Sequence, residues 1–430
     1  MNRITISKSD FKVETTSTWL ASVLQFALDI DFLAPLQAFK LKMKEVNYTV
    51  SQKLATILAS VIMGCESTKD INEVLGPEIL AANMLGMEHF PDQSQINTVL
   101  NRMDKDSVNQ LQSIHHQLFM NHSNTLSSPD DIVVDIDQSG LVANSKTYEF
   151  ASKGYFPHKR GKTGYQVSAA FVGKHSEVLE FYFDPGNTHC QDRMEDLLSS
   201  ITVKLGEHLA VGKVILRADS GYGAIDNIEK LMSIKGLHFI VKGYSSRKAA
   251  SIAKEIPMDS YEQADEAAWV YELPKSSSGL RTILVQVLGS KGELTYTLLH
   301  TNINHVKLSA VEAFHFYNGR QTIEAFFKAA KNTYGIRSFR TSKFYGIYSF
   351  LWLVFITHNL IVWFKNAKLK DSDLFDSGVK VLVKKCSRVK GFVERTSQGI
   401  NVILEPLSKL AKLLLEALSE PDYVQLCFLV

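Results

Sequence analysis

The feature that most constrains this chain is a row of four polar side chains on one predicted helix, residues 315–335. The segment HFYNGRQTIEAFFKAAKNTYG contains good helix formers and no proline, so it predicts a single helix. At about 100° per residue, the four side chains fall within roughly 60° of arc; they are Tyr317, Arg320, Glu324 and Lys331. A carboxylate between two cations and a phenol suits a metal-bound phosphate. The alternative is an ordinary solvated charged face.

Two aspartates upstream each end a short apolar segment. DDIVVDIDQSGL contains a run of Ile and Val that predicts a buried strand, and Asp135 and Asp137 lie two residues apart on one face of it. In GKVILRADSGYGAIDNIEKL, Asp219 ends a second predicted strand before glycines turn the chain into a helix. Taken alone, an Asp at a strand end is more often a turn or helix cap than a metal ligand. The polar row downstream reverses that preference, so that a metal-ligand role becomes the favoured interpretation of the two aspartates.

Together these motifs resemble the DDE-type insertion-sequence transposases, in the group that carries the signature Y-x2-R-x3-E-x6-K. The D-x-S after the first strand resembles the first acidic motif of that family, RADSGY resembles the second, and DPGNTH resembles a turn common in the group. The resemblance implies a catalytic and metal-binding triad of Asp137, Asp219 and Glu324. Asp135 remains a rival of Asp137, which is favoured because the family places this carboxylate two residues before a Ser or Thr, here Ser139.

The rest of the row is implied to contact DNA. In the same group, the residues that match Tyr317, Arg320 and Lys331 hold the phosphate of the element end. Relatives with a hairpin mechanism carry a Trp on the strand before this helix, to stack a flipped base. Here that strand is ELTYTLLHTN, where Tyr296 is the nearest aromatic and would stack less strongly. A hairpin intermediate is therefore in doubt, whereas nicking and strand transfer are not.

Three carboxylates suit the chemistry of phosphodiester cleavage. The reaction needs an activated water and a neutralised leaving oxygen, and two divalent ions can supply both. Mg²⁺ prefers oxygen ligands, so it is the expected cofactor, with Mn²⁺ as a substitute. The cysteines are scattered along the chain and lack zinc-site spacing, which predicts core thiols in a reducing compartment; they are Cys65, Cys190, Cys386 and Cys427.

Local clusters of positive charge predict DNA contact better than the net charge, which is only +2. Lys159, Arg160 and Lys162 lie among aromatic residues in SKGYFPHKRGKTGY, next to the first acidic motif. Arg337 and Arg340 follow the polar row. Cations interleaved with aromatics suit a phosphate backbone and unstacked bases. Ordinary solvated surface is the alternative for either cluster.

One segment is apolar enough to be mistaken for a membrane span. Residues 344–364, FYGIYSFLWLVFITHNLIVWF, contain no Asp, Glu, Lys or Arg and are long enough to cross a bilayer. Thr357, His358 and Asn359 sit together in its middle, where hydrocarbon penalises them. We therefore expect a buried core helix and no membrane partner. The first residues are polar and lack a secretory signal, so we expect a cytoplasmic, nucleoid-associated protein of a bacterium or archaeon.

The order of predicted elements indicates an α/β protein with an RNase H-like catalytic core. Three strands, a helix, a strand ending in an acid and a late helix bearing the last acid follow that order. A helical region precedes the core, and strand-like segments such as AAWVYEL and RTILVQVLG interrupt it as a β-rich insertion. The predicted domains are a helical DNA-end-binding domain (1–125), the core (126–241 and 294–366), the insertion (242–293) and a basic C-terminal region with a possible dimerisation helix (367–430).

The resemblance implies a DNA transposase that cuts at the ends of its insertion sequence by two-metal hydrolysis and joins the 3′ ends to target DNA. Its partners would be double-stranded DNA, both the terminal inverted repeats and the target, and a second copy of the chain as a homodimer on DNA. Two alternatives stay open: an RNase H-like DNA nuclease, and a domesticated transposase-derived DNA-binding protein. The presence of all three acids disfavours an inactive site.

Overall fold

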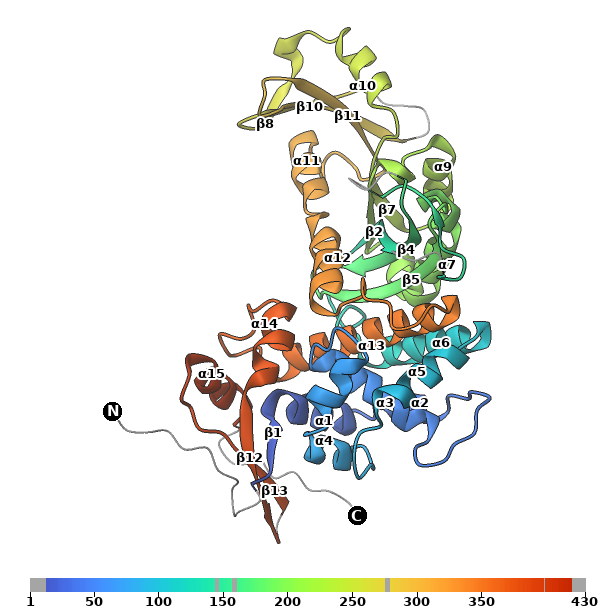
Figure 1. Cartoon of the computed structure of the whole chain (residues 1–430). Coiled ribbons are helices and arrows are strands. Elements are labelled where there is room, and N and C mark those ends of the chain that lie inside the picture. The colour runs from blue at the N-terminus through green and yellow to red at the C-terminus, as the bar shows by residue number, and fades with distance from the viewer. Residues whose placement is uncertain (1–12, 144–146, 157–160, 275–278, 398, 420–430) are drawn as a thin grey trace, which may run out of the picture. The chain divides into compact units, whose positions relative to one another are not determined.

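A computed structural model describes residues 13–143, 147–156, 161–274, 279–397 and 399–419. The chain divides into two compact units, one formed by Met1–Leu118 and Ala329–Val430 and the other by Phe119–Lys328 (Figure 1). Two of the predicted DNA contacts, Lys159 and Arg160, lie outside the described residues. The predicted division into a helical domain, a core, an insertion and a C-terminal region stays a prediction.

The second unit is built on a ten-stranded mixed sheet. Its strand order is β3-β4-β2-β6-β7-β11-β10-β9-β8, with β5 paired to β4. The strands are β2 (Ile132–Ala143), β3 (Ser152–Lys153), β4 (Thr163–Val172), β5 (Glu177–Pro185), β6 (Val214–Ala218), β7 (Leu237–Lys242), β8 (Glu262–Asp265), β9 (Ala268–Glu272), β10 (Arg281–Leu288) and β11 (Leu294–Thr301). An α/β protein with a large mixed sheet is thereby confirmed.

The middle of the sheet changes from antiparallel to parallel at β2. Strands β5, β4 and β2 pair antiparallel, whereas β2, β6 and β7 pair parallel. Strand β11 then pairs antiparallel with β7 and joins the later hairpins to the same sheet. The first acidic motif therefore lies on β2, at the centre of the sheet, and the second follows the neighbouring strand β6.

Helices cover both faces of this sheet (Figure 1). Apolar residues of β2 such as Val134 and Ile136 point into a core with α7 (Met194–Lys204), α8 (Gly206–Ala210) and α9 (Ile225–Ser233). On the opposite face, α12 (Gln321–Thr333) packs near β4 through stacked rings of Phe171 and Phe326, 4.6 Å apart. Helix α11 (Ala310–Asn318) packs over the outer strands β7, β9 and β10. Because strand residues alternate between faces, the acids of β2 face α12.

The predicted single helix over residues 315–335 is wrong, because the chain is interrupted at Gly319 and Arg320 between α11 and α12. The Arg320 amide donates to the Tyr317 carbonyl, and the Phe316 carbonyl accepts from a side chain of the sheet, Arg217. Helix periodicity does not predict a hydrogen bond from a distant residue to a helical carbonyl. Tyr317 therefore ends one helix, while Glu324 and Lys331 belong to the next.

The first unit is mainly helical. Its N-terminal helices are α1 (Thr18–Asp29), α2 (Ala34–Gln37), α3 (Val50–Ile62), α4 (Ile79–Met84), α5 (Gln93–Arg102) and α6 (Lys105–His122), with the short π-helix η1 (Ile71–Leu75). Asp92 caps α5 through the amides of Ser94 and Gln95. Strand β1 (Thr15–Ser17) pairs with β12 (Lys390–Thr396), which pairs with β13 (Gly399–Ile403). The two ends of the chain thus share one small sheet.

The apolar segment forms α13 (Phe344–Lys368), which packs against α1, α3 and α5. It is long and apolar enough to cross a membrane, but 94% of its most apolar window is buried. The polar triplet finds partners in the first unit: Thr357 donates to the Leu353 carbonyl, His358 bonds the Tyr334 hydroxyl, and Asn359 bonds His115. The structure places α13 among the N-terminal helices, whereas the sequence assigned it to the catalytic core.

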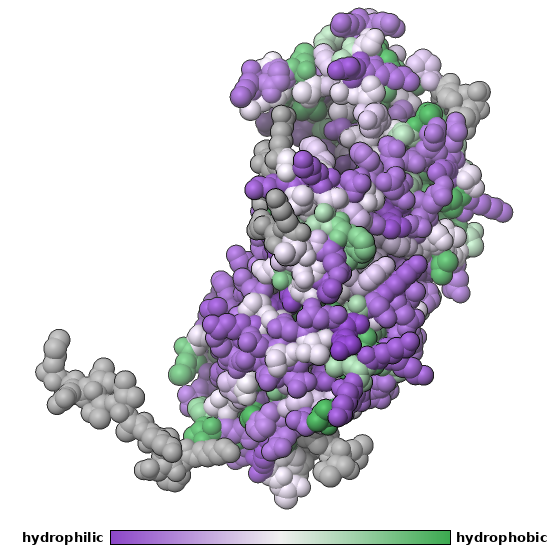
Figure 2. Space-filling model, turned by 45° about the vertical axis from the view of Figure 1, so that its right-hand side comes forward, coloured by the Kyte–Doolittle hydropathy of each residue, from purple (hydrophilic) through white to green (hydrophobic). Residues whose placement is uncertain are grey.

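The remaining elements complete the two units. They are α14 (Val379–Lys384) and α15 (Lys409–Leu418) in the first unit, α10 (Ser246–Ala253) in the second, and the short 3-10 helices η2 (Cys190–Arg193), η3 (Ser220–Tyr222), η4 (Met258–Ser260) and η5 (Cys386–Arg388). On the face shown in Figure 2, hydrophobic side chains are scattered among hydrophilic ones. Scattered apolar residues of this kind are usual on a protein surface and need no special role.

Candidate active site

Two of the predicted acids lie side by side, Asp137 in the middle of β2 and Asp219 directly after the end of β6. The parallel register of β2 and β6 pairs Asp135 with Arg217 and Ile136 with Ala218. One further step along both strands brings Asp137 beside Asp219. Asp219 also caps η3 by accepting the Gly221 amide at 2.9 Å, so the turn role and a site role coexist in one side chain. The sheet therefore brings together two carboxylates that lie far apart in the sequence.

Other residues of the predicted site, Arg320 and Glu324, lie at the break between α11 and α12 and close to these acids. Arg320 Nη1 lies 3.3 Å from Asp137 Oδ2, and Arg320 Nη2 donates to Glu324 Oε1 at 3.1 Å. The guanidinium therefore lies between the first and third predicted acids. Burial raises the pKa of Tyr317 to about 12, with the adjacent charge of Arg320 opposing the rise. The phenol thus keeps its proton at neutral pH.

Lys331 lies farther along α12. It is partly buried and belongs to the last turn of the helix, seven residues after Glu324. With a rise of 1.5 Å per residue, it stands about 10.5 Å along the helix axis and on nearly the same side as Glu324.

The rival acid Asp135 has a different environment. Its side chain is fully buried and accepts two hydrogen bonds from Arg217, from Nε at 2.7 Å and from Nη2 at 2.8 Å. The Thr322 hydroxyl donates to it as well, at 2.7 Å. Asp135 is therefore engaged in a buried ion pair, which leaves Asp137 as the carboxylate of β2 that geometry favours as a metal ligand.

Asp137 lacks a full compensating charge. Burial raises its pKa to about 6, the Arg320 guanidinium opposes the rise, and the neighbouring Asp219 adds to it. At neutral pH the ionised carboxylate is thus held in unfavourable surroundings, the situation that a bound cation relieves. Perturbed carboxylates of this kind gather at functional sites, although structural ion pairs produce them too.

The donor set fits a hard divalent cation in its chemistry. Asp137, Asp219 and Glu324 offer only oxygen atoms, which are the ligands that Mg²⁺ and Mn²⁺ accept. Within the described part of the chain, no three His, Cys, Asp or Glu side chains are close enough to share one ion. Arg320 occupies the space between Asp137 and Glu324. In this arrangement the guanidinium supplies the positive charge that an ion would otherwise provide.

We expect Asp137→Asn to stabilise the metal-free protein at neutral pH. Because the folded pKa of about 6 exceeds the unfolded value of about 3.9, the native state binds the proton more tightly. The contribution of Asp137 to the free energy of unfolding is therefore greatest below pH 4 and is lost as the pH rises towards 6. The substitution should raise that free energy by about 1–3 kcal/mol at pH 7.5.

Urea unfolding in EDTA at pH 4.5 and pH 7.5 measures this effect. The gain of Asp137→Asn over wild type should shrink at the lower pH, because Asp137 is then largely protonated. An Asn variant that is less stable than wild type at pH 7.5 would contradict the assigned environment of Asp137.

Sequence reasoning missed Arg217, Thr322 and Cys190 as neighbours of the site. The Cys190 thiol approaches η3: a Cβ added at Gly221 would lie 2.6 Å from its Sγ. A signal for Arg217 was present in RADSGY, where a cation interrupts an apolar strand two residues before Asp219 and on the same face. A buried strand tolerates such a cation only with a partner, and the partner is Asp135.

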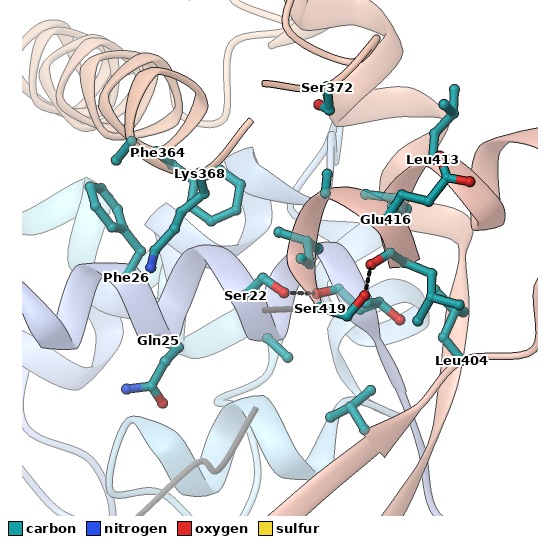
Figure 3. A pocket seen from close by; sticks show the side chains of 18 of the residues that line it. Ser22, Gln25, Phe26, Phe364, Lys368, Ser372, Leu404, Leu413, Glu416 and Ser419 are labelled. Atoms are coloured by element: carbon teal, nitrogen blue, oxygen red, sulfur yellow. Dashed lines mark hydrogen bonds between the residues drawn. The ribbon is translucent and has the colours of Figure 1, made fainter. Parts of the chain in front are cut away.

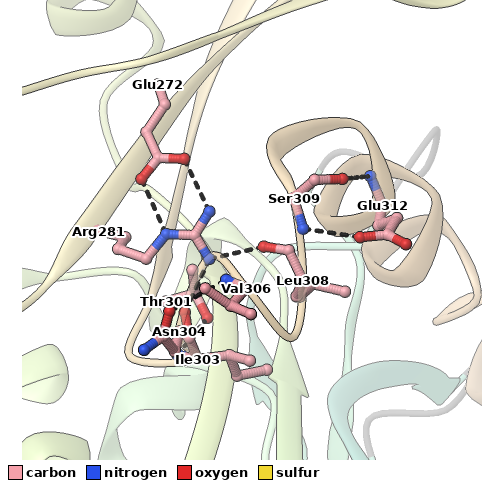
Figure 4. A network of polar contacts seen from close by, with 9 residues as sticks. All are labelled: Glu272, Arg281, Thr301, Ile303, Asn304, Val306, Leu308, Ser309 and Glu312. Carbon is pink, nitrogen blue, oxygen red and sulfur yellow. Dashed lines mark hydrogen bonds and ion pairs between the residues drawn. The ribbon is translucent and has the colours of Figure 1, made fainter.

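A second polar network anchors the start of α11 (Figure 4). Arg281 of β10 forms a bidentate pair with Glu272 of β9, at 2.8 and 2.7 Å. Its Nη1 donates to the carbonyls of Ile303 and Leu308, in the loop that leads to the helix. Ser309 then caps α11 in a reciprocal pair with Glu312. The loop before the helix is thereby tied to the outer strands of the sheet.

The predicted DNA contacts differ in how the structure presents them. Lys162 and Arg337 are exposed. The Arg340 guanidinium stacks over Phe350 at 4.6 Å and donates to the Cys65 carbonyl, an interior position that does not favour DNA contact. Tyr296 packs against a small core of α10, β10 and β11, which disfavours a base-stacking role for it.

A pocket in the first unit holds none of the predicted site residues (Figure 3). It is lined by α1, the end of α13, the hairpin strand β13 and α15. Apolar side chains such as Phe26 and Leu404 alternate there with hydroxyl and amide groups of Ser22 and Gln25. The lining also carries the acids Asp29, Asp371, Asp373 and Glu416, none of which is a predicted catalytic residue.

A family model described as transposase DDE domain group 1 matches residues 29–420. No protein with a curated description matches. A solved piggyBac transposase synaptic complex with hairpin DNA is 12% identical, with 88% of this chain and 82% of that chain covered and a TM-score of 0.49. A Mos1 transposase paired-end complex with the left transposon end is 14% identical, with 45% of this chain and 61% of that chain covered and a TM-score of 0.17.

A structure of the mariner Mos1 paired-end complex with Mg is 13% identical, with 50% of this chain and 75% of that chain covered and a TM-score of 0.15. These similarities to solved structures are weak. The assignment of a family therefore rests on the family model, which spans nine-tenths of the chain.

Proposed function

The chain belongs to the family described as transposase DDE domain group 1, and from this premise we propose that it excises and inserts the DNA element that encodes it. Enzymes with this domain are nucleases and strand transferases that use divalent metal ions. The observation that carries the proposal is that four side chains come together: Asp137 within β2, Asp219 directly after β6, and Arg320 and Glu324 at the start of α12. We propose that the enzyme cuts at both element ends and joins the 3′ ends to target DNA.

We propose an RNase H-like catalytic core. The order β5-β4-β2-β6-β7, with an antiparallel half and a parallel half, supports it. Strands β8, β9 and β10 would belong to the β-rich insertion (242–293), and β11, in the core as predicted, would join them to β7. We further propose that the helices within residues 1–125 bind the element ends and that residues 367–430 contribute to dimerisation.

The three acids are the proposed catalytic residues, and Asp137, Asp219 and Glu324 would hold Mg²⁺ or Mn²⁺. Bound divalent ions activate the attacking water and neutralise the leaving oxygen. Asp137 and Asp219 already adjoin, while Glu324 is paired with Arg320. In our proposal Arg320 exchanges this pair for a phosphate of the element end, which frees Glu324 for metal binding.

The proposed DNA contacts surround these acids. Tyr317, Arg320 and Lys331 would hold the phosphate of the element end, in keeping with the signature Y-x2-R-x3-E-x6-K. A guanidinium is well suited to that task because its planar donors match phosphate oxygens. Further backbone contacts would come from the basic residues Lys162 and Arg337, together with Lys159 and Arg160. Element inverted repeats and target DNA are the proposed partners of a homodimer in the cytoplasm, associated with the nucleoid.

Cleavage of the element's own boundaries tests this function. A DNA fragment that carries the gene and its flanking sequence would be incubated with the full chain and Mg²⁺, beside a fragment with shuffled flanks. We expect breaks at two inverted repeats around the gene, absent from shuffled DNA and abolished by EDTA. Equal cutting of both fragments would favour a general nuclease, and specific binding without cutting would favour a domesticated DNA-binding protein.

A further inference from the structure

A buried polar network joins the sheet to the break between α11 and α12. Arg217 of β6 pairs with Asp135 of β2 and donates from Nη1 to the Phe316 carbonyl at 2.7 Å. Its guanidinium also lies over the Phe316 ring, 5.1 Å from the centroid. Asp135 in turn accepts the Thr322 hydroxyl of α12. The two charged residues therefore hold one group before the break and one group after it.

Two glycines let the helices come this close. A Cβ at Gly319 would lie 2.4 Å from Arg217 Nη1, and a Cβ at Gly173 would lie 2.5 Å from the Thr322 hydroxyl oxygen. Real Cβ atoms do not approach other heavy atoms so closely, so any side chain at either position would displace the network. The two glycines therefore leave the space in which Arg217 and Thr322 make their contacts.

The groups held by this network directly flank the proposed catalytic groups. Phe316 precedes Tyr317, and Thr322 lies two residues after Arg320 and two before Glu324. On the strands, Asp135 lies two residues before Asp137 and Arg217 two before Asp219, on the same face of the sheet. Each group in this network therefore lies within one or two residues of a proposed site residue along the same segment of chain.

We infer that Asp135, Arg217 and Thr322 are positioning residues, which set the place of Arg320 and Glu324 relative to Asp137 and Asp219. The inference rests on the proposed function. A buried ion pair that also engages both sides of a helix break has a defined geometry, because its donors and acceptors must all be satisfied at once. A site whose ligands come from two strands and one helix needs such support to keep its ligands within a fraction of an ångström.

The hydroxyl of Thr322 offers the sharpest test. Thr322→Val keeps the shape of the side chain and removes the donor to Asp135, whereas Thr322→Ser keeps the donor. Thr202→Val is the matched control, since the Thr202 hydroxyl bonds the Leu198 carbonyl of its own helix on the other face of the sheet. Mn²⁺ binding to each DNA-free full-length variant would be measured by calorimetry, beside its melting temperature and the Mn²⁺ concentration for half-maximal cleavage of the gene-bearing fragment.

We expect Thr322→Val to weaken Mn²⁺ binding three- to tenfold and to raise the Mn²⁺ concentration for half-maximal cleavage by a similar factor. Thr322→Ser should restore most of the affinity, and Thr202→Val should match wild type. A Thr322→Val protein that melts at a lower temperature but binds Mn²⁺ like wild type would overturn the inference, because a merely structural contact behaves in that way. A wild-type chain that neither binds Mn²⁺ nor cleaves the gene-bearing fragment would instead refute the proposed function, and the inference with it.

Discussion

Replacing Asp137, Asp219 or Glu324 by alanine should reduce divalent-metal-dependent cleavage of the element ends on the order of 10³-fold or more. The reason is that ions held by these carboxylates mainly stabilise charge that develops in the transition state. Binding of uncleaved end DNA should change little, because cationic contacts to phosphates supply most of that affinity. Single-turnover cleavage and gel-shift titration, on one labelled end fragment, separate the two effects.

The controls for this experiment come from acids outside the site. Asp226 is exposed on α9, and Asp226→Ala should cleave like wild type. Asp135→Ala should instead yield little folded protein, because it leaves Arg217 buried without its carboxylate, at a cost of about 3–5 kcal/mol. Normal cleavage by Asp137→Ala, together with a stable but inactive Asp135→Asn protein, would show that Asp135 is the ligand.

Leu353→Asp should prevent the first unit from folding. Leu353 has no exposed surface and lies in the middle of α13, which packs against α1, α3 and α5. An unpaired carboxylate there would either be desolvated or take up a proton, and we expect a loss of about 4 kcal/mol or more in the free energy of unfolding. A domain is stabilised by only about 5–15 kcal/mol in total, so much of that margin would be lost.

Soluble yield and thermal unfolding measure the effect of Leu353→Asp. The matched control is Ala367→Asp, which places the same charge on the same helix at an exposed position. It should change stability by less than about 1 kcal/mol. A Leu353→Asp protein that melts like wild type would contradict the burial of α13, and wild-type protein that stays with membranes after an alkaline wash would contradict its place in a protein core.

Much of the secondary structure could be predicted from local pattern. The apolar run before Asp137 is β2, the alternating segments AAWVYEL and RTILVQVLG are β9 and β10, and Asp92 caps α5. These features depend on neighbours within a few residues, which is the range over which periodicity and capping act. The helical spacing of Glu324 and Lys331 on α12 was visible for the same reason.

The contact that holds the break at Gly319 was not visible, because Arg217 and Phe316 lie 99 residues apart in the sequence. Helix propensity favours continuation through this segment, and it is the donation from Arg217 to the Phe316 carbonyl that accompanies the interruption. The buried position of Arg340 is a similar case. A basic residue near a predicted site suggests DNA contact, and only the structure shows that its partner is the Cys65 carbonyl. Both cases depend on contacts between distant segments.

The sequence by itself determined the identities and spacing of the acids, the strands that carry Asp137 and precede Asp219, and the α/β class. Those properties follow from residue chemistry and from the periods of strand and helix. Only the tertiary structure distinguishes the two acids of β2, because both share a face and Arg217 pairs with Asp135. It also decided that Arg320 lies between Asp137 and Glu324, since strand pairing and helix docking join residues whose distance along the chain carries no information about their distance in space.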